Sequence, residues 1–390
     1  MKEIKRFILF FISELKPKGR LLTPFNIITT PIILLGIALI IYRFTNGLGA
    51  ISEGGSQDFP WGLLIGFNVV TGVALAGGGY IIPFIVYVLG LKKYRPMVRS
   101  AILTALLGYI FYAFAVLLDL GRPWHIFNPI IGNSFGISSI LFIFVWVLVL
   151  YITCLFAEFL PAITEWLGNE RFRKFAKKLV VGAVIFAITL STISQAGVGA
   201  LFLLAPTKLH PLWYSNITIF FFISSIFSGL SVVIIIDSIS HKVFKDQAYN
   251  FGELIIGLGK AACLTMFVYL SLKLIDIAHS RHWQYFQSPM GHLYLVELIG
   301  FILFPMVMFT EGVRRKVMGL IKLAAFITVI GVILNRLNVT MIAFKWYLPH
   351  HFPGWMECVI SLTIILIQIW AFRWIVNRMP ILREHKWENE

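Results

Sequence analysis

The sequence predicts an all-α polytopic membrane protein, and three observations support this fold class. Of its 390 residues, 58% are hydrophobic and only 13% are charged, whereas ordinary soluble domains have roughly 45–50% apolar and about 25% charged residues. The apolar residues form long continuous runs, and the Lys and Arg residues lie in short clusters between these runs. A soluble fold of this composition would leave too much apolar surface in water, so that class is excluded.

Ten runs are long enough to span a bilayer, whose core of about 30 Å needs ~20 apolar residues in a helix. Runs such as 140–152 are apolar throughout instead of alternating, which favours helices over the strands of a barrel. The second run contains Gly77, Gly78, Gly79 and Pro83, so we expect that helix to be kinked or tilted. The ten predicted spans cover residues 25–44, 61–90, 100–118, 136–160, 179–204, 216–240, 252–275, 291–311, 317–335 and 354–376, within a membrane domain of residues 21–376.

The segments outside this domain have different patterns. Residues 1–20 place apolar side chains on one helical stripe and basic side chains elsewhere, which is typical of an amphipathic helix lying on the membrane. The apolar run there is short, contains Glu14 and lacks a small-residue cleavage site, which argues against a signal peptide. Residues 377–390 are expected to form a cytoplasmic tail.

The basic residues predict the orientation. With ten spans, both termini and the loops after spans 2, 4, 6 and 8 share one side of the membrane, and this side holds 25 of the 33 Lys and Arg residues. The opposite side holds seven, and Lys260 lies within span 7. Because cytoplasmic loops are enriched in Lys and Arg, both termini are expected in the cytoplasm, with the protein in the cytoplasmic (inner) membrane. The net charge of +15 is then a topology signal, not a nucleic-acid-binding surface.

The predicted outer loops carry the unusual residues, in segments 117–129, 205–216, 274–286, 332–340 and 351–357. Tryptophans at a membrane interface are common and need no function, which accounts for Trp213 or Trp355 taken singly. Charged and amide groups at helix ends are not explained in this way. They are Asp119 with Arg122, Asp276 with Arg281, and the group Asn335, Arg336 and Asn338.

Ionisable residues inside spans are costly and therefore indicate function or pairing. We consider Asp237, Lys260 and Glu158 as candidates for a proton path. Asp237 and Lys260 could pair as neighbours in the bundle, which would offset much of their desolvation cost. Alternatively, Glu158 and Asp237 could lie shallow enough to reach water.

Several cofactors are not expected in this chain. All nine His residues lie in loops or near span ends, whereas a membrane b-type haem needs axial His residues deep in facing helices. The three Cys residues lie singly in different spans, so no zinc ribbon or iron–sulfur cluster is predicted. A phosphate-binding GxxxxGK[ST] loop is also lacking. Any metal centre of a redox reaction is therefore expected in another subunit.

The outer ends of spans 3 and 7 suggest an internal duplication. Residues 117–127 read LLDLGRPWHIF and residues 274–286 read LIDIAHSRHWQYF, each with Asp near the helix end and Arg and Trp shortly after. Since both spans run in the same direction, we predict two four-helix bundles, spans 2–5 and 6–9, flanked by spans 1 and 10.

Six segments in order resemble the NrfD/PsrC family, most closely its ten-span branch of HybB-like and DsrP-like membrane subunits. They are residues 59–80, 94–110, 119–129, 205–214, 331–339 and 351–357. The resemblance implies a quinone-interacting integral subunit of a respiratory oxidoreductase complex. Such subunits bind menaquinone or another quinone without haem or iron–sulfur cluster. They exchange electrons with a ferredoxin-like iron–sulfur subunit on the outer face, and the complex is completed by further catalytic or cytochrome subunits.

The resemblance can be carried to individual positions. Relatives commonly have His where this sequence has Ser194, beside Gln195, and an acidic residue early in span 4, where residues 138–144 have none. Two proton-handling groups of relatives are thus absent, whereas Asp237 occupies an acidic position near the end of span 6. The matching positions around the outer end of span 3 are Tyr109, Asp119, Arg122 and Trp124.

We therefore predict a quinone site near the outer face. Because quinone reduction takes up two protons and oxidation releases two, an acid or base must lie nearby, and Asp119 is the candidate. An anchor that binds quinone or lipid without turnover is the main alternative, and a secondary transporter is a more distant one. The predicted quinone-binding residues are Tyr109, Asp119, Arg122, Trp124, Gln195, Asn335, Arg336 and Asn338.

Overall fold

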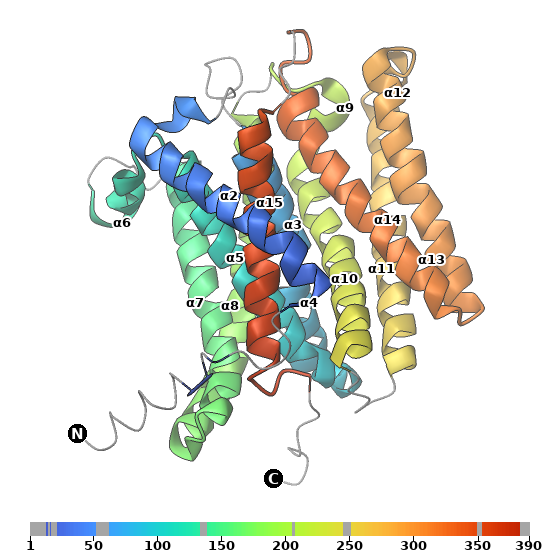
Figure 1. Ribbon diagram of the computed structural model, residues 1–390. Helices are drawn as coiled ribbons and strands as arrows, with labels where there is room; N and C mark the ends of the chain where they lie inside the picture. The colour runs from blue at the N-terminus through green and yellow to red at the C-terminus, as the bar shows by residue number, and fades with distance from the viewer. Residues whose placement is uncertain are drawn as a thin grey trace.

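The computed structural model describes residues 13–14, 16, 22–51, 62–132, 139–204, 207–244, 251–348 and 353–382. These residues form a helical bundle (Figure 1), and within them the one strand-like feature is an isolated bridge between Leu209 and Phe344. Ten helices in this part of the chain are long and apolar enough to cross a membrane. The predicted all-α class and the ten spans are therefore confirmed.

The ten spans differ in regularity. Six are single α-helices: α2 (Pro24–Asn46), α7 (Ile140–Trp166), α8 (Glu170–Leu203), α10 (Ile217–Phe244), α11 (Phe251–His279) and α15 (Trp355–Val376). The third combines η4 (Lys92–Met97) with α5 (Val98–Asp119). The eighth combines α12 (Pro289–Leu295), η7 (Val296–Leu303) and α13 (Phe304–Arg314), and the ninth α14 (Met318–Leu337) and η8 (Asn338–Ile342). Short helices between spans are η1 (Leu48–Ala50), η5 (Pro123–Phe127), α6 (Asn128–Ile131), α9 (Pro211–Tyr214) and η6 (His282–Tyr285).

The second span is interrupted, as its glycines predicted. It runs through η2 (Leu64–Thr71), α3 (Gly72–Leu75), α4 (Gly78–Pro83) and η3 (Phe84–Val88). The break at Gly77 lies against α10, where a Cβ atom on Gly77 would stand 2.2 Å from the carbonyl oxygen of Ser225. Only a residue without a side chain allows this backbone approach.

The helices pack in two halves that share an interface. The second span, α5, α7 and α8 pack in sequence, and α10, α11, α13 and α14 pack against one another. Helix α10 also contacts α8 and the second span, and α14 contacts η2. The grouping into two four-helix bundles remains our interpretation of these contacts. We use "outer end" for the end of the molecule at which α5, α8 and α11 terminate, which lies at the top of Figure 1.

Helices α2 and α15 flank the bundle and cross each other closely (Figure 1). A Cβ atom on Gly36 of α2 would stand 1.9 Å from Oγ1 of Thr363 of α15, so the crossing depends on this glycine. The Trp370 indole donates a hydrogen bond of 3.0 Å to Oγ1 of Thr29. Helix α15 also packs on α5, so the flanking pair lies against the first half of the bundle.

Most of the predicted interfacial helix, residues 1–20, and residues 383–390 of the predicted tail lie outside the described residues. The parts that are described meet at the cytoplasmic end predicted from the basic residues. Arg378 Nε donates to the Glu14 carbonyl oxygen at 2.5 Å and Nη2 to that of Lys16 at 2.8 Å. Toward the same end, Arg99 forms an ion pair of 2.9 Å with Glu165.

Candidate functional site

The outer end of α5 carries Asp119 as its last residue, half-buried. Arg43, in the last turn of α2, is 2% exposed and reaches this end. Its Nε donates a hydrogen bond of 2.7 Å to the carbonyl oxygen of Leu118, and its Nη2 donates to that of Leu120. These carbonyls have no partner within the helix, so a guanidinium satisfies them and complements the negative end of the helix dipole.

The charges around Asp119 differ from the sequence interpretation. Arg122 is exposed in the loop that follows α5, and it forms no ion pair with Asp119. The charged groups that act on the Asp119 carboxyl are Arg43 of α2 and Glu357 of α15. Trp124, on η5, is 71% exposed. Arg122 and Trp124 therefore lie on the surface above the helix ends, and Asp119 lies below them.

Deeper in the same half lies a group of buried hydroxyls, on Tyr109 of α5, Tyr151 of α7, and Ser191 and Ser194 of α8. Within the described part of the chain none of the four has a hydrogen-bond partner. The Tyr109 and Tyr151 rings are 4.5 Å apart, and the side chains of Ser191, Ser194 and Gln195 surround the Tyr109 hydroxyl. Buried polar groups are almost always hydrogen-bonded, so water or a polar ligand is expected among them. We call these four residues the hydroxyl cluster.

Gln195 borders the hydroxyl cluster and connects it to the second span. Its Nε2 donates a hydrogen bond of 2.7 Å to the carbonyl oxygen of Val73, just before the break in that span. The structure therefore brings Tyr109 and Gln195 together, as predicted residues of one site, although they are far apart in sequence.

The ionisable residues toward the cytoplasmic end are arranged differently from the predicted pair. Asp237 is 1% exposed, and its Oδ1 accepts a hydrogen bond of 2.7 Å from Ser100 of α5. Lys260 is exposed on α11 and forms no ion pair with Asp237. The suggested pairing was wrong because α10 turns Asp237 toward α5, whereas α11 turns Lys260 away from the bundle. Both carboxylate oxygens of Glu158, on α7, are buried and have no partner among the described residues.

The second half contains a separate polar cluster centred on Glu297 of η7, which is 4% exposed. Its carboxylate accepts hydrogen bonds from Nδ2 of Asn335 at 2.5 Å, from Nδ2 of Asn338 at 2.9 Å and from Nε1 of Trp213 at 3.1 Å. We call these four residues the Glu297 cluster. Nothing in the sequence pattern joins an isolated glutamate in a span to amides 38 residues or more away.

Arg336 attaches this cluster to α10. Its Nη1 donates to Oδ1 of Asn335 and its Nη2 to Oγ of Ser224, both at 2.6 Å, and its guanidinium lies 3.5 Å from the Phe221 ring centroid. Asn335, Arg336 and Asn338 thus lie together as predicted. In the described part of the chain, their hydrogen bonds go to Glu297 and α10, not to Tyr109 or Asp119.

Two charged residues of α11 complete the outer end of the second half. Lys273 is 3% exposed, and its Nζ lies 4.1 Å from the Phe220 ring centroid. One turn later Asp276 accepts hydrogen bonds from Oγ of Ser215 at 2.6 Å and from Nδ2 of Asn216 at 2.8 Å. Sequence reasoning treated Lys273 as a topology signal, since a basic residue near a span end carries no mark of burial.

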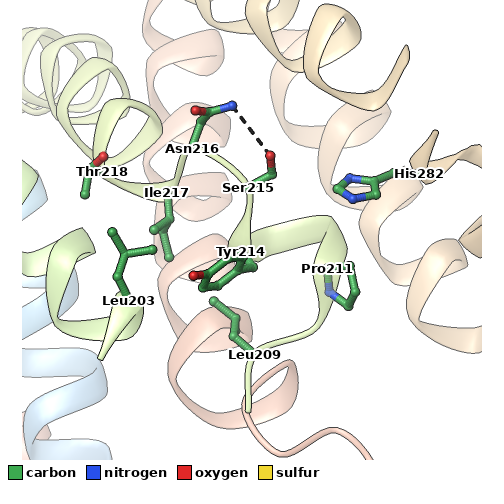
Figure 2. A pocket seen from close by; sticks show the side chains of 9 residues that line it. All are labelled: Leu203, Leu209, Pro211, Tyr214, Ser215, Asn216, Ile217, Thr218 and His282. Atoms are coloured by element: carbon green, nitrogen blue, oxygen red, sulfur yellow. Dashed lines mark hydrogen bonds between the residues drawn. The ribbon is translucent and has the colours of Figure 1, made fainter. Parts of the chain in front are cut away.

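Next to Asp276 is a cavity of about 440 Å³ (Figure 2). This volume is within the range of small-molecule sites. None of the predicted quinone-binding residues lines it. Its lining residues are Leu203, Leu209, Pro211, Tyr214, Ser215, Asn216, Ile217, Thr218 and His282.

The loop behind this cavity holds His210, which is 1% exposed and enclosed by Trp213, Tyr285 and Trp346 at ring-centroid distances of 5.0–5.7 Å. Burial lowers the pKa of His210 to about 4, and the neighbouring His282 acts in the same direction. Its Nδ1 accepts a hydrogen bond of 3.3 Å from the Leu212 amide, so the ring is held as a neutral acceptor. Across the described residues, no group of three or more His, Cys, Asp or Glu side chains is arranged to hold a metal ion.

Comparison with known proteins places this architecture. A family model described as polysulphide reductase, NrfD, matches residues 52–349. A protein of Nitratidesulfovibrio vulgaris is 42% identical over 94% of this chain and 96% of its own length.

Two further relatives have informative names. The probable Ni/Fe-hydrogenase 2 b-type cytochrome subunit of Escherichia coli is 28% identical over 93% of this chain and 94% of its own. A selenate reductase subunit of Mesobacillus selenatarsenatis is 22% identical over 91% and 93%. The chain therefore belongs to the NrfD family of integral membrane subunits of reductase and hydrogenase complexes, and it resembles the HybB-like members.

Proposed function

We propose that this chain exchanges electrons between a membrane quinone, with menaquinone as the first candidate, and a ferredoxin-like iron–sulfur subunit docked at the outer face. The chain would not be a complete enzyme alone, because the metal centres and the second substrate site would belong to other subunits. Family membership over residues 52–349 supports the class of complex. The observation that carries the quinone role is the outer half of α5, where a half-buried carboxyl and a buried, unpartnered hydroxyl lie on one helix.

The chemistry of a quinone headgroup suits these groups. Its two carbonyl oxygens need hydrogen-bond donors, and its reduction or oxidation needs a group that gives or takes protons. Tyr109 can donate to a headgroup oxygen, since its hydroxyl has no partner in the described part of the chain. Asp119, half-buried at the outer end, can exchange protons with water on that side. Gln195 would position the headgroup, and Arg122 and Trp124 would border its entrance.

Asn335, Arg336 and Asn338 would contribute less directly. Their side chains already bind Glu297 and α10, so we assign them to the shape of the second half. The cavity beside Asp276 is a second candidate location for the headgroup, because Ser215, Asn216 and His282 offer polar atoms beside apolar walls. Substitutions in the two places distinguish them.

A proton path from the cytoplasmic end is a further part of this proposal. Glu158 and Asp237 are buried carboxyls with oxygen atoms that have no partner among the described residues. Tyr151 lies two turns before Glu158 on α7 and belongs to the hydroxyl cluster, so water between these groups could connect Glu158 to Tyr109. Lys260, the third predicted member, is exposed on α11 and would contribute at most at the surface.

The experiment that tests the function is isolation of the intact complex from native membranes with this chain tagged. We expect an iron–sulfur protein to copurify and menaquinol or menaquinone to be turned over with an artificial electron acceptor or donor. A complex that contains bound quinone but does not turn it over would support the anchor alternative. A preparation with no redox partner would contradict both.

A further inference from the structure

The flanking helices α2 and α15 lie outside residues 52–349, the part of the chain that matches the family model. Their outer ends nevertheless direct charged side chains into the first half of the bundle. Arg43 of α2 and Glu357 of α15 are 2% and 1% exposed, and both act on the Asp119 carboxyl. This convergence needs an explanation beyond anchoring in the membrane.

Arg43 is unlike the residues around it. Its neighbours Ile41 and Phe44 are 59% and 46% exposed on the surface of α2, as expected for a helix that faces lipid. Arg43 instead donates hydrogen bonds to the carbonyl oxygens of Leu118 and Leu120, the residues on either side of Asp119. A buried guanidinium held by two carbonyls fixes the backbone from which the Asp119 side chain projects, and it places a positive charge beside that side chain.

Glu357 makes the corresponding contact from α15. Its Oε1 accepts a hydrogen bond of 3.1 Å from the backbone N–H of Leu63, at the beginning of the second span. One turn further along α15, Oγ of Ser361 accepts a hydrogen bond of 2.8 Å from Nδ2 of Asn68 in the same span. Helix α15 therefore holds the outer half of the second span and adds a negative charge near Asp119.

We propose that Arg43 and Glu357 are positioning residues for Asp119, so that the flanking helices are part of the quinone site. Arg43 fixes the backbone on both sides of Asp119, and the carboxyl experiences the opposite charges of Arg43 and Glu357 together. Such a setting lets a carboxyl both accept and release a proton during turnover. This inference rests on the proposed quinone function.

The test uses the intact complex in native membranes, with variants Arg43→Gln, Arg43→Lys and Glu357→Gln. The matched control is Arg373→Gln, because Arg373 of α15 donates a hydrogen bond of 3.1 Å to Asn26 of α2 near the opposite ends of the two helices. The amount of assembled complex, and kcat and KM for menaquinol per assembled complex, are measured for each. A cap with a purely structural role would change the amount of complex and leave kcat per complex unchanged.

We expect Arg43→Gln and Glu357→Gln each to lower kcat per complex about tenfold or more, as for the loss of one charge-assisted hydrogen bond. Arg43→Lys should restore part of the rate, and Arg373→Gln should match the parent. Because Arg43 acts through Asp119, Arg43→Gln should cause no further loss in a variant that already carries Asp119→Asn. If Arg43→Gln does not assemble, the kcat of Arg43→Lys relative to that of Arg373→Gln decides.

Unchanged kcat in Arg43→Gln, or equal effects of Arg43→Gln and Arg373→Gln, would overturn the inference. So would a full additional loss of rate in the Asp119→Asn background. A parent complex without any quinol turnover would refute the proposed function itself. A parent complex that turns over quinol while Arg43→Gln and Glu357→Gln are unaffected would refute only the role of the flanking helices.

Discussion

The Glu297 carboxylate accepts a hydrogen bond of 2.9 Å from the side-chain amide of Asn338, and both residues are buried in the second half of the bundle. The same carboxylate binds Asn335 and Trp213, so one acidic residue of η7 holds the polar groups of α9 and the end of α14. Removing it would leave three buried donors without an acceptor.

We therefore expect Glu297→Ala to destabilise the protein strongly. Each buried donor left unsatisfied costs about 1–3 kcal/mol, which corresponds to a fall of roughly 5 °C or more in the thermal denaturation midpoint. The midpoint is measured on the detergent-solubilised protein. Glu170→Ala is the control, since the Glu170 side chain is 69% exposed and its ion pair with Arg173 lies on the surface. Equal midpoints for the two variants would contradict the role of Glu297.

Asp119→Asn should abolish quinone-dependent turnover while the complex still assembles. An asparagine keeps the shape of the side chain but cannot take up or release a proton, and general acid–base groups contribute about 10²- to 10⁴-fold to rate. Turnover per complex is measured with menaquinol, and assembly is measured by copurification of the partner proteins. Glu253→Gln, at an exposed position near the start of α11, is the control. Normal turnover in Asp119→Asn would remove Asp119 from the mechanism.

Tyr109→Phe tests the hydroxyl cluster. Since the Tyr109 hydroxyl has no partner in the described part of the chain, its removal should cost little stability. A hydrogen bond from this hydroxyl to the headgroup would contribute about 1 kcal/mol or more, so quinol turnover should fall by roughly fivefold or more. Tyr42→Phe, on the exposed face of α2, is the control. A large loss of stability with normal turnover would show that the hydroxyl has a structural role.

Headgroup binding at the second candidate location would give a different result. In that case Asn216→Ala, beside the cavity of Figure 2, should lower turnover and Tyr109→Phe should not. Asn216 donates to Asp276, so the thermal denaturation midpoint of Asn216→Ala must be measured as well.

Glu158→Gln and Asp237→Asn test the proposed proton path. Both carboxyls are buried toward the cytoplasmic end, so their replacement should slow turnover if protons reach the site from that side. Lys260→Gln should have a smaller effect, because Lys260 is exposed. The measurement is menaquinol turnover together with pH changes inside vesicles containing the complex. If turnover in both carboxyl variants equals that of the parent, protons are exchanged only with the outer side.

His210 predicts a dependence of stability on pH. Burial lowers its pKa to about 4 from an ordinary value of 6.5. The unfolded chain therefore binds more protons than the folded chain between these values, and stability should fall as the pH drops through this window and be complete above it. The thermal denaturation midpoint at pH 7 and pH 5 is the measurement. His210→Asn, which keeps an acceptor for the Leu212 amide, should reduce the difference, whereas His125→Asn in the exposed loop should not.

The fold could be predicted to the level of individual spans because the lipid requirement for long apolar helices is written directly in composition. The kinked second span was also predictable, since Gly77 and Pro83 interrupt a helix in known ways. The described residues do not test the helix expected over residues 1–20, most of which they do not include.

The site could be predicted only in part, and the reason is physical. A span that is apolar all round does not reveal which face points inward. Arg43 and Lys273 therefore read as topology signals, although both are buried. For the same reason the sequence suggested that Asp237 pairs with Lys260, whereas Ser100 is its partner. Tyr109 and Asp119 were found because they stand at positions that match a family.

The most direct test of the central claim is whether this chain passes electrons between quinone and its partner. Menaquinol is mixed rapidly with the oxidised, intact complex, and the iron–sulfur signal of the partner is followed by electron paramagnetic resonance. We predict reduction of the cluster in the parent complex, and little or none in an Asp119→Asn complex that contains the same proteins. If the cluster equilibrates more readily with menaquinone than with menaquinol, the reverse mixing, reduced complex with menaquinone, should oxidise it. Failure of the cluster to respond to either form of the quinone, in a complex that retains all its partner proteins, would contradict the proposed function.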